Sequence, residues 1–313
     1  MRILFMGTPE FAASYLEYLI ENGFDVVAVI TQKDKPRGRG QKLLPTPVKE
    51  VALKYGLPVF QPSNLNREGM EIIEKYRPEI GVVVAYGRLI KNPFLEAIPF
   101  YNIHTSLLPK YRGPAPMQRA IENGENVTGV TIFKISEGMD EGDIALQCAF
   151  EIGQCETFGQ VYEKMITHGT QLLKEFLARY PIELVPQDHL LATYAPKITK
   201  EDLYVDFSRP AVVVRNKIRA YDPNPGVRTR FGDIEIKLFG ACDMERILSN
   251  PFNEIEVGKI VKIDKNGALI KTLDNGLWVS HVQFPGKGRI TFGDAKNGGL
   301  ISEGDILGKY KNQ

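Results

Sequence analysis

The first 180 residues alternate short apolar runs with amphipathic stretches of helical period. Apolar runs of this length predict strands buried on both faces, and their alternation with helices is typical of a parallel sheet covered on both sides. We expect strands at residues 2–5, 25–30, 79–85, 100–105, 128–135 and 144–152, and helices at residues 9–22, 47–55, 66–76, 116–123 and 158–180. The pattern predicts an α/β fold with a Rossmann-like, doubly wound sheet.

The pattern changes at about Pro181, where several prolines interrupt a polar connection. One more helix is expected to end at Ala220, with its N-cap supplied by the stretch from Asp206 to Pro210. Short apolar runs separated by turns follow, and they predict a small OB-like β-barrel, although sandwiches share this pattern. The expected strands are residues 227–231, 234–239, 258–264, 268–272 and 277–283. We therefore predict an N-terminal domain at 1–189, a linker at 190–208 and a C-terminal domain at 209–313.

Composition narrows the class of protein. A chain of 313 residues is long enough for two domains. With 43% hydrophobic and 25% charged residues it resembles average globular proteins, which excludes disordered, collagen-like and coiled-coil classes. No apolar run approaches the roughly 18 residues that span a bilayer, and the N-terminal apolar run is too short for a signal peptide. We expect a soluble protein that is not exported.

The three cysteines, Cys148, Cys155 and Cys242, are far apart in the sequence. They are too few for a disulfide framework or for a cysteine-based zinc site. This cysteine usage favours a reducing, cytoplasmic location.

Charge is distributed unevenly along the chain. The net charge is only +1, yet residues 1–207 carry 22 Lys and Arg against 26 Asp and Glu, whereas residues 208–313 carry 17 against 12. Clustered cations favour a polyanionic partner because their binding releases counterions. Chance asymmetry in a small domain remains an equal alternative on charge alone.

Two loops follow the first two expected strands. Gly7-Thr8-Pro9-Glu10 occupies the place of a dinucleotide-binding loop but has one of its glycines, which disfavours a nicotinamide cofactor. Residues 33–42 carry five cations, one anion and two glycines, without the motif of a phosphate loop. Because this flexible basic arm follows a strand at the edge where open α/β proteins bind ligands, it predicts a contact with a polyanion. A solvated surface loop is the alternative.

The densest set of reactive side chains lies at the expected strand 100–105. Asn102 and His104 are two residues apart, so they share one face of that strand. The acidic, glycine-rich loop 137–143 could bring a carboxylate to the same edge, where it would orient His104 and favour its protonated form for acid–base chemistry. The loop lacks the ligand spacing of a calcium site. Since no serine or cysteine nucleophile is placed nearby, direct group transfer is the predicted chemistry.

Several motifs together resemble one enzyme family. They are Gly7-Thr8-Pro9-Glu10-Phe11, Thr31-Gln32 with Gly38-Arg39-Gly40, Val83-Val84-Ala85-Tyr86-Gly87, Asn102-x-His104-x-Ser106-Leu107-Leu108-Pro109 with Arg112-Gly113, Gly129-Val130-Thr131, Met139-Asp140-x-Gly142-Asp143, Ile218-Arg219-Ala220 and Pro223-x-Pro225. On these residues the chain resembles the methionyl-tRNA formyltransferases over essentially its whole length. The Asn-x-His element is also similar to glycinamide ribonucleotide formyltransferase and to folate-dependent domains of formyltetrahydrofolate dehydrogenases. The basic arm and the basic C-terminal domain favour a tRNA acceptor.

The resemblance implies a formyltransferase-type catalytic domain, 10-formyltetrahydrofolate as the donor, methionyl initiator tRNA as the acceptor, and no metal. It also implies a cytoplasmic monomer without a membrane partner. Two other functions stay open: a folate formyltransferase acting on a sugar-linked or nucleotide amine, and an RNA-binding adaptor without activity. The implied site residues are Asn102, His104 and Asp140 for catalysis, Tyr86, Gly87, Arg88, Ser106, Leu107, Leu108 and Pro109 for folate, Phe11 for the methionine side chain, and Arg37, Arg39 and Lys42 for tRNA.

Overall fold

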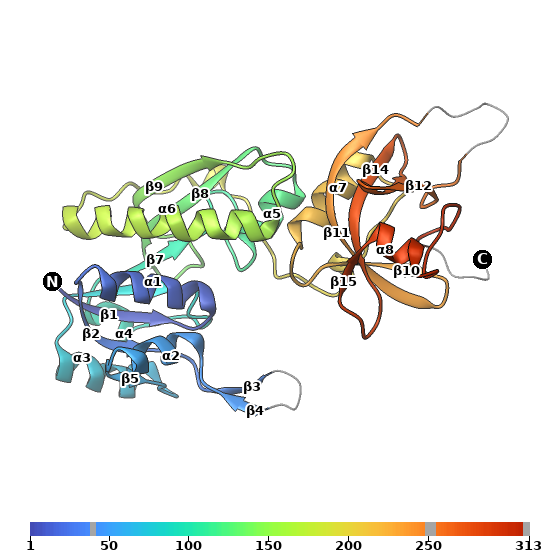
Figure 1. The fold of residues 1–313 in the computed structure, drawn as a ribbon. Helices are drawn as coiled ribbons and strands as arrows, with labels where there is room; N and C mark the ends of the chain where they lie inside the picture. Colours follow the sequence, from blue (N-terminus) through green and yellow to red (C-terminus); the bar gives the residue numbers. More distant parts are fainter. Residues whose placement is uncertain (38–41, 248–254, 309–313) are drawn as a thin grey trace. The chain divides into compact units, whose positions relative to one another are not determined.

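The computed structural model describes residues 1–37, 42–247 and 255–308 and divides into two compact units (Figure 1). Both units are built from three separate stretches of the chain. Unit 1 contains Met1–Gly113, Gly129–Ala149 and Lys164–Tyr194, and unit 2 contains Pro114–Thr128, Phe150–Glu163 and Ala195–Gln313. The predicted domains, with boundaries at 189 and 208, are instead consecutive segments of the chain. These boundaries remain a prediction about which segments fold on their own.

Unit 1 is built on a seven-stranded sheet in the order β5-β2-β1-β6-β7-β8-β9. Its strands are β1 (Arg2–Gly7), β2 (Asp25–Ile30), β5 (Val59–Phe60), β6 (Ile80–Val84), β7 (Phe100–His104), β8 (Val127–Lys134) and β9 (Ile144–Glu151). Its helices before β8 are α1 (Glu10–Glu21), α2 (Pro47–Lys54), α3 (Met70–Tyr76), preceded by a π-helical turn at Leu65–Gly69, and α4 (Phe94–Ala97). Helix α5 (Pro116–Glu122) also precedes β8 in the sequence, but it belongs to unit 2. The predicted α/β class is confirmed, whereas β5 and α4 are too short to have been recognised.

The sheet is mixed. Strands β5, β2, β1, β6 and β7 run parallel, but β8 pairs with β7 in the antiparallel direction, with His104 opposite Thr131. The expected parallel pairing therefore holds from β5 to β7 and is wrong at β8. The physical reason lies in the connection between these strands: parallel neighbours need a crossover element, usually a helix, whereas the helix of this connection, α5, belongs to unit 2 and packs there on α7 (Ala211–Ala220). Apolar periodicity carries no information on strand direction.

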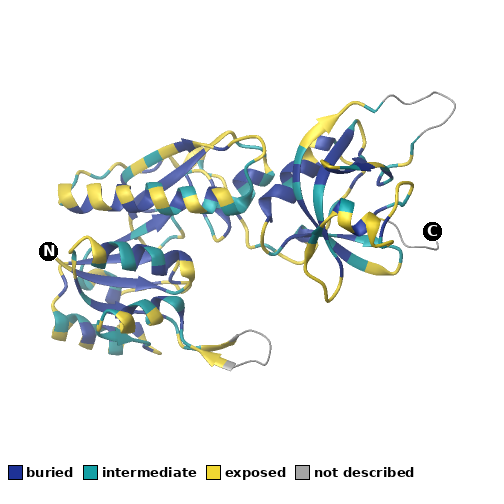
Figure 2. Cartoon of the chain, in the orientation of Figure 1, coloured by how far each residue is buried: buried dark blue, intermediate teal, exposed yellow. Residues whose placement is uncertain are grey.

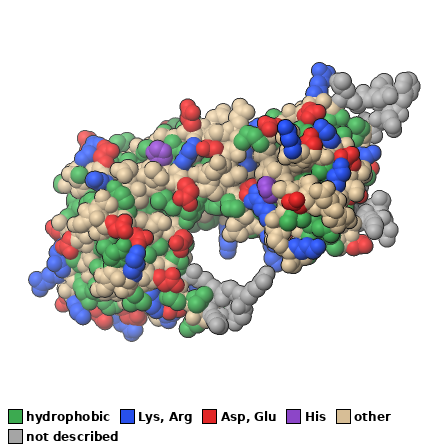
Figure 3. All heavy atoms as spheres, in the orientation of Figure 1, with side chains coloured by type: hydrophobic (Ala, Val, Ile, Leu, Met, Phe, Trp, Pro, Cys, Tyr) green, Lys and Arg blue, Asp and Glu red, His purple; other side chains and the backbone are tan. Residues whose placement is uncertain are grey.

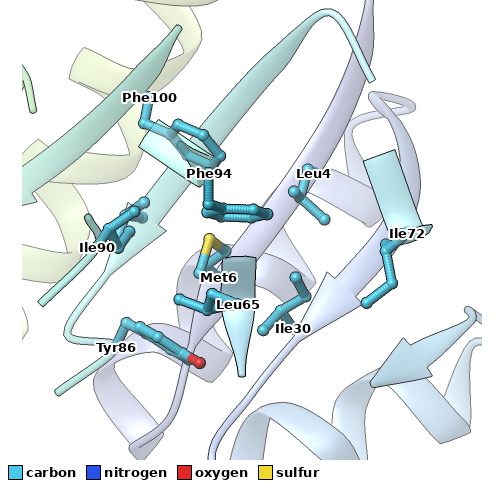
Figure 4. Packing of buried hydrophobic residues seen from close by; sticks show 11 residues of the cluster. Leu4, Met6, Ile30, Leu65, Ile72, Tyr86, Ile90, Phe94 and Phe100 are labelled. Atoms are coloured by element: carbon cyan, nitrogen blue, oxygen red, sulfur yellow. The ribbon is translucent and has the colours of Figure 1, made fainter. Parts of the chain in front are cut away.

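One face of this sheet is packed by a cluster of buried hydrophobic side chains (Figure 4). The cluster comprises Leu4, Met6, Ala28, Ile30, Leu65, Ile72, Val83, Tyr86, Ile90, Phe94 and Phe100. The rings of Phe94 and Phe100 lie 5.0 Å apart, so the short helix α4 is fixed against the start of β7. This packing holds the strand that carries the candidate site.

Helix α6 (Phe158–Arg179) is amphipathic, with buried positions along one side and exposed positions along the other (Figure 2). Within unit 1 its buried Phe176 ring packs at a tilt against Tyr101 of β7, with ring centroids 4.7 Å apart, and Tyr15 of α1 donates a hydrogen bond to the Met165 carbonyl at 2.8 Å. No helix among the described residues is both long and apolar enough to cross a bilayer.

Unit 2 contains an antiparallel sheet in the order β10-β11-β14-β13-β12, with β15 paired to β14. The strands are β10 (Val227–Phe231), β11 (Ile234–Glu245), β12 (Ile260–Asp264), β13 (Gly267–Lys271), β14 (Gly276–Gln283) and β15 (Arg289–Thr291), followed by α8 (Phe292–Asn297). All five predicted strands are present, and the antiparallel β character of the C-terminal part is confirmed.

The start of α7 differs from its prediction. The predicted local N-cap is wrong: the Asp206 carboxylate accepts hydrogen bonds from Ser208, and Pro210 precedes the helix without a side-chain cap. The carboxylate of Asp274, 63 residues away, accepts from the Ala211 amide at 2.8 Å. A distant turn supplies what local sequence signals assign to nearby residues.

The basic arm also differs from the expected loop. Strands β3 (Lys35–Arg37) and β4 (Lys42–Leu44) pair as an antiparallel hairpin. Proline is tolerated in edge strands, and each strand of a two-stranded ribbon is an edge strand, so Pro36 is compatible with β3. The part of the predicted arm from 38 to 41 lies outside the described residues.

The cysteine interpretation needs correction as well. Cys155 and Cys242 form a disulfide, with their Cα atoms 4.8 Å apart, although 87 positions separate them in the sequence. The turn that carries Cys155 is held within unit 2 by Arg219, whose Nη1 donates to the carbonyls of Gly153 at 2.9 Å and Glu156 at 3.2 Å. The fold therefore brings together two cysteines whose spacing gave no sign of pairing.

We expect reduction of this disulfide to lower the free energy of unfolding by roughly 2–4 kcal/mol, because a crosslink that closes a long loop restricts the unfolded chain. Urea denaturation with and without a phosphine reductant measures the difference, and Cys242→Ser should behave like the reduced wild type. Cys148→Ser is the matched control, since Cys148 is a free thiol. Equal midpoints for the oxidised and reduced proteins would contradict the prediction.

A second prediction concerns acid stability. In unit 2 a hydrogen-bonded ion pair with Arg119, at 2.8 Å, lowers the pKa of Asp202 from 3.8 to about 2. The stabilisation is therefore present above pH 4 and is lost as the pH falls towards 2. Asp202→Asn should remove about 1 kcal/mol at neutral pH and flatten the acid limb of a stability profile. The exposed Asp233→Asn variant should follow the wild-type curve, and an unchanged acid limb in Asp202→Asn would count against the pair.

Candidate active site

Strand β7 brings Asn102 and His104 to the same face of the unit 1 sheet. It is hydrogen-bonded on both sides, to β6 at Val83 and to β8 at Thr131. Asn102 is half-buried and His104 is buried. Among the described residues, nothing forms a hydrogen bond with the Asn102 side chain, so its amide is available to a substrate.

The His104 ring is fixed from one side. Its Nε2 donates a hydrogen bond to the Tyr111 carbonyl oxygen at 2.8 Å, and its ring meets Phe133 edge-on with centroids 6.4 Å apart. Because a carbonyl oxygen can only accept, Nε2 carries a proton. The other nitrogen, Nδ1, faces the carboxylate of Asp140.

Asp140 approaches His104 from the loop between β8 and β9. Its Oδ2 lies 3.7 Å from His104 Nδ1 and accepts a hydrogen bond from the Gly113 amide at 2.8 Å. Asp140 has a φ of +56°, a left-handed conformation that costs a non-glycine residue about 1 kcal/mol or more. The loop therefore presents this carboxylate in a backbone conformation that is unfavourable by itself.

The separation of the two groups has a chemical consequence. A distance of 3.7 Å is too long for a hydrogen bond, yet short enough for the carboxylate to attract positive charge on the ring. Since Nε2 already donates to Tyr111, a second proton on Nδ1 gives the charged imidazolium form. Such a proton remains available to a reacting oxygen, because no acceptor within hydrogen-bond distance takes it in the described part of the chain.

Two buried residues that sequence reasoning did not select surround the Asp140 loop. Arg112 has a side chain only 1% exposed, and its Nε and Nη2 donate to the Gln187 Oε1 at 3.1 and 2.7 Å. The Gln187 Nε2 in turn donates to the carbonyls of Asp140 and Gly142. Arg112 belongs to one of the motifs that carry the family resemblance, but no role was predicted for it. Gln187 lies in a proline-flanked stretch typical of a linker. No local signal marks Gln187.

The first group of residues assigned to folate begins in the core. Tyr86 belongs to the hydrophobic cluster, where burial raises the pKa of its hydroxyl (Figure 4). Its backbone carbonyl accepts from Thr8 Oγ1 at 2.9 Å and from Gln32 Nε2 at 3.2 Å. Gly87 has a φ of +80°, and the exposed Arg88 follows, donating to the carbonyl of Ser63 at 3.1 Å. Only Arg88 offers a side chain to the surface here.

The second group forms the turn after β7. Ser106 is fully buried and donates from Oγ to the Lys110 carbonyl at 2.6 Å, and Leu108 is 3% exposed. Leu107 and Pro109 are half-buried. The turn is braced by Thr131, whose Oγ1 donates to the Ser106 carbonyl at 2.6 Å. Its alternate side chains are therefore internal, and the others lie nearer the surface.

The remaining predicted residues are Phe11, which is buried, and three cations of the basic arm whose side chains the structure does not describe. Phe11, at the start of α1, is 5% exposed and packs on Tyr15 with ring centroids 5.0 Å apart. Arg37 and Lys42 lie on β3 and β4, but their side chains are outside the described structure, as is Arg39 entirely. On the face drawn in Figure 3, cations and anions are interspersed and do not form one basic patch.

One group of potential metal ligands occurs within residues 1–37, 42–247 and 255–308. Cys155, Cys242 and Asp243 have ligand atoms within 4.8 Å of one another. The disulfide between the two cysteines occupies both sulfur atoms, so this group lacks the thiolates that a metal would need.

Comparison with protein families accounts for most of the chain. The family model described as "Formyl transferase" matches residues 1–177, and "Formyl transferase, C-terminal domain" matches residues 197–299. Among solved structures, HypX from Aquifex aeolicus in complex with tetrahydrofolic acid has a TM-score of 0.66 at 20% identity over 99% of this chain and 51% of that one. The sugar 3N-formyl transferase WlaRD has a TM-score of 0.64 at 20% identity, over 92% and 99%. These two likenesses show the fold.

Similarity to curated proteins is closer. A methionyl-tRNA formyltransferase from Fervidobacterium nodosum is 73% identical over 309 residues, which are 98% of this chain and 99% of that protein. A methionyl-tRNA formyltransferase from Thermotoga maritima is 50% identical over 97% of both chains. With two formyl transferase models on its two parts and such relatives along its whole length, the chain belongs to the methionyl-tRNA formyltransferase family.

Proposed function

We propose that this enzyme transfers the formyl group of 10-formyltetrahydrofolate to the α-amino group of methionine on initiator tRNA. The observation that carries the proposal is the pairing of His104 with Asp140 at 3.7 Å, beside the unpaired amide of Asn102, in a chain of this family. These groups suit an acyl transfer without a covalent enzyme intermediate. They stabilise an oxyanion and move a proton.

The proposed reaction begins with attack of the amine on the formyl carbon. Asn102 and the Nδ1 proton of His104 donate to the oxygen as it gains negative charge, because both face the same side of β7. The amine loses its proton towards Asp140, directly or through a water, and the N10 atom of the folate regains a proton as it leaves. Asp140 also stabilises the charge on His104.

We assign folate binding to the turn Ser106–Pro109 and to the segment Tyr86–Arg88. Since the side chains of Tyr86 and Ser106 are buried, these residues are expected to contribute backbone groups. Arg88 is the exposed cation next to them and suits the carboxylate end of a folate. Phe11 is assigned to the methionine side chain.

For tRNA we propose Arg37, Arg39 and Lys42 on the arm, together with the basic region 209–313. We also propose a monomer in the cytoplasm, where its substrates occur. The Cys155–Cys242 disulfide removes the argument from cysteines, so this location depends on the substrates alone. Removing residues beyond 208 would strip α7 from α5 within unit 2, so truncation is a poor test of the division of labour.

A transfer assay with defined acceptors tests the proposal. Charged initiator tRNA, charged elongator methionine tRNA and an amino-sugar nucleotide are each offered with 10-formyltetrahydrofolate, and release of tetrahydrofolate is measured. We expect rapid formylation of initiator tRNA and little of the other two. Preference for the amino sugar would establish the sugar formyltransferase alternative, and no release of tetrahydrofolate with any acceptor would favour the RNA-binding adaptor.

We expect activity to survive exhaustive treatment with a chelator, because the proposed steps use protein donors and acceptors only. Transfer is measured before and after chelation at a fixed magnesium concentration chosen to keep the tRNA folded. Activity that falls at least tenfold and returns with one added transition-metal ion would contradict the mechanism. The Cys155–Cys242–Asp243 group, whose sulfur atoms are oxidised, gives no reason to expect that outcome.

A further inference from the structure

We infer that Gln187 is a positioning residue, which holds Asp140 in register with His104 for the transfer step. The inference deepens the proposed function and rests on it. It also assigns a role to a segment that sequence analysis treated as the end of a domain, since Gln187 comes shortly after Pro186 and before the predicted linker at 190. Four hydrogen bonds within unit 1 connect Gln187 to Arg112 and to the Asp140 loop.

The Gln187 side chain is 5% exposed and uses both ends of its amide. Its Oε1 accepts from two donors of Arg112, and its Nε2 donates to the carbonyl oxygens of Asp140 at 2.9 Å and Gly142 at 2.7 Å. The orientation of the amide is therefore determined by its surroundings: a guanidinium on one side must meet oxygen, and two carbonyls on the other must meet N–H. Every polar atom of the side chain is satisfied.

These two bonds hold the part of the loop that requires support. Asp140 adopts its left-handed φ of +56°, a conformation that side chains rarely take unless neighbouring contacts impose it. Gln187 donates to the backbone carbonyl of Asp140 itself and to the carbonyl of Gly142, two residues later. Within the part of the chain that the structure describes, the Asp140 carboxylate, by contrast, has one backbone donor, the Gly113 amide. Gln187 thus fixes the loop backbone from which the carboxylate projects.

Arg112 holds the Gln187 side chain in place. Its side chain is 1% exposed, its backbone amide donates to the Thr193 carbonyl at 2.8 Å, and its Nη atoms also reach the His189 Nδ1 at 3.3 Å. Thr193 Oγ1 accepts from the amide of Tyr111, the residue whose carbonyl binds His104. The segment 187–193 therefore contacts the supports of both His104 and Asp140.

A purely structural role would affect stability alone, so the test needs a variant that keeps the contact with Arg112. Gln187→Glu does so: its carboxylate can pair with the guanidinium, but it places oxygen against the two carbonyls that now receive N–H. We expect this variant to remain folded while the loop carrying Asp140 moves. Gln187→Met, of similar length, removes the amide without adding charge and serves as a second variant if the first is unstable. Gln171→Glu, exposed on α6, is the matched control.

The first readout separates kcat from KM in the transfer assay. Both Gln187 variants should lower kcat by about 10- to 100-fold, because a displacement of the proton-accepting group affects the transition state. The KM values for the folate and for the tRNA should stay within about twofold, since the Gln187 side chain is buried and its amide is fully engaged by protein partners. Gln171→Glu should match the wild type in both parameters.

The second readout is the ring signals of histidine in an NMR spectrum of ¹⁵N-labelled enzyme. The chain has four histidines, so His104 can be assigned with His104→Ala, and His168 and His281 serve as internal references. In the Gln187 variants the His104 ring signals should shift, because the carboxylate opposite Nδ1 has moved, while both references stay in place. This measurement does not depend on turnover.

The outcomes distinguish this inference from the proposed function. A kcat within twofold of wild type, or a loss that appears only in KM, overturns the role of Gln187 while His104→Ala and Asp140→Ala remain inactive. Unshifted His104 signals in both Gln187 variants overturn it as well. If His104→Ala and Asp140→Ala themselves retain full activity, the proposed function has failed, and the inference fails with it.

Discussion

Replacing His104 or Asp140 by alanine is expected to lower kcat for formyl transfer by about 100-fold or more, with the protein still folded. In the proposed mechanism, the His104 substitution removes a donor to the developing oxyanion, and the Asp140 substitution removes the group that balances charge on the ring and accepts the amine proton. Asn102→Ala should cause a loss of similar order, because its amide, half-buried on β7, is the second donor that we propose. Rates of transfer to charged initiator tRNA measure all three.

A substitution that preserves the shape of the Asp140 loop can separate the effect of the negative charge from the effect of the position of the side chain. In Asp140→Asn the side-chain oxygen can still accept from the Gly113 amide, so the loop should keep its shape while the negative charge is lost. We expect a loss of activity close to that of Asp140→Ala. His168→Ala, on α6, is the control for histidine removal. Retention of more than half of the wild-type rate by any of the three alanine variants, with a native melting temperature, would remove that residue from the mechanism.

The fold was predictable where local pattern and tertiary packing agree. Strand β2 has the predicted bounds, residues 25–30, because its apolar run is buried between the neighbouring strands β5 and β1. The direction of β8 was not predictable, since an apolar strand looks the same in either direction. The cap of α7 comes from Asp274, and the partner of Cys155 is Cys242, so both depend on contacts between residues far apart in sequence. Local signals cannot contain such contacts.

The candidate site was predictable to the extent that its chemistry lies on one strand. The spacing of Asn102 and His104 indicated a shared face, and the structure places Asp140 3.7 Å from the imidazole. The support for that carboxylate was not predictable. Gln187 is a neutral residue in a proline-flanked segment, and its importance arises from four hydrogen bonds that exist only in the folded chain.

A second large effect is expected at Arg39, in the basic arm that β3 and β4 begin and end. Arg39 itself lies outside the described residues, so the prediction depends on the sequence: four cations surround it within residues 33–42. If it forms a forked contact with phosphate or a base edge near the methionine, Arg39→Ala should lower kcat/KM for charged tRNA by about 10- to 100-fold. Arg39→Lys should fail to restore it, because an ammonium cannot form two parallel hydrogen bonds.

A salt series distinguishes this contact from general attraction. Nonspecific attraction by the arm weakens with salt in all variants, because it depends on the release of counterions from the tRNA. If the contact is forked, the kcat/KM of Arg39→Lys should be lower than that of the wild type at every salt concentration. If the contact depends on charge alone, the two enzymes should have equal kcat/KM throughout the series. Lys33→Ala is the control for removal of one arm cation. An Arg39→Ala enzyme as active as wild type at all salt concentrations would remove the arm from the tRNA site, and the basic region 209–313 would then have to supply the whole electrostatic contribution to tRNA binding.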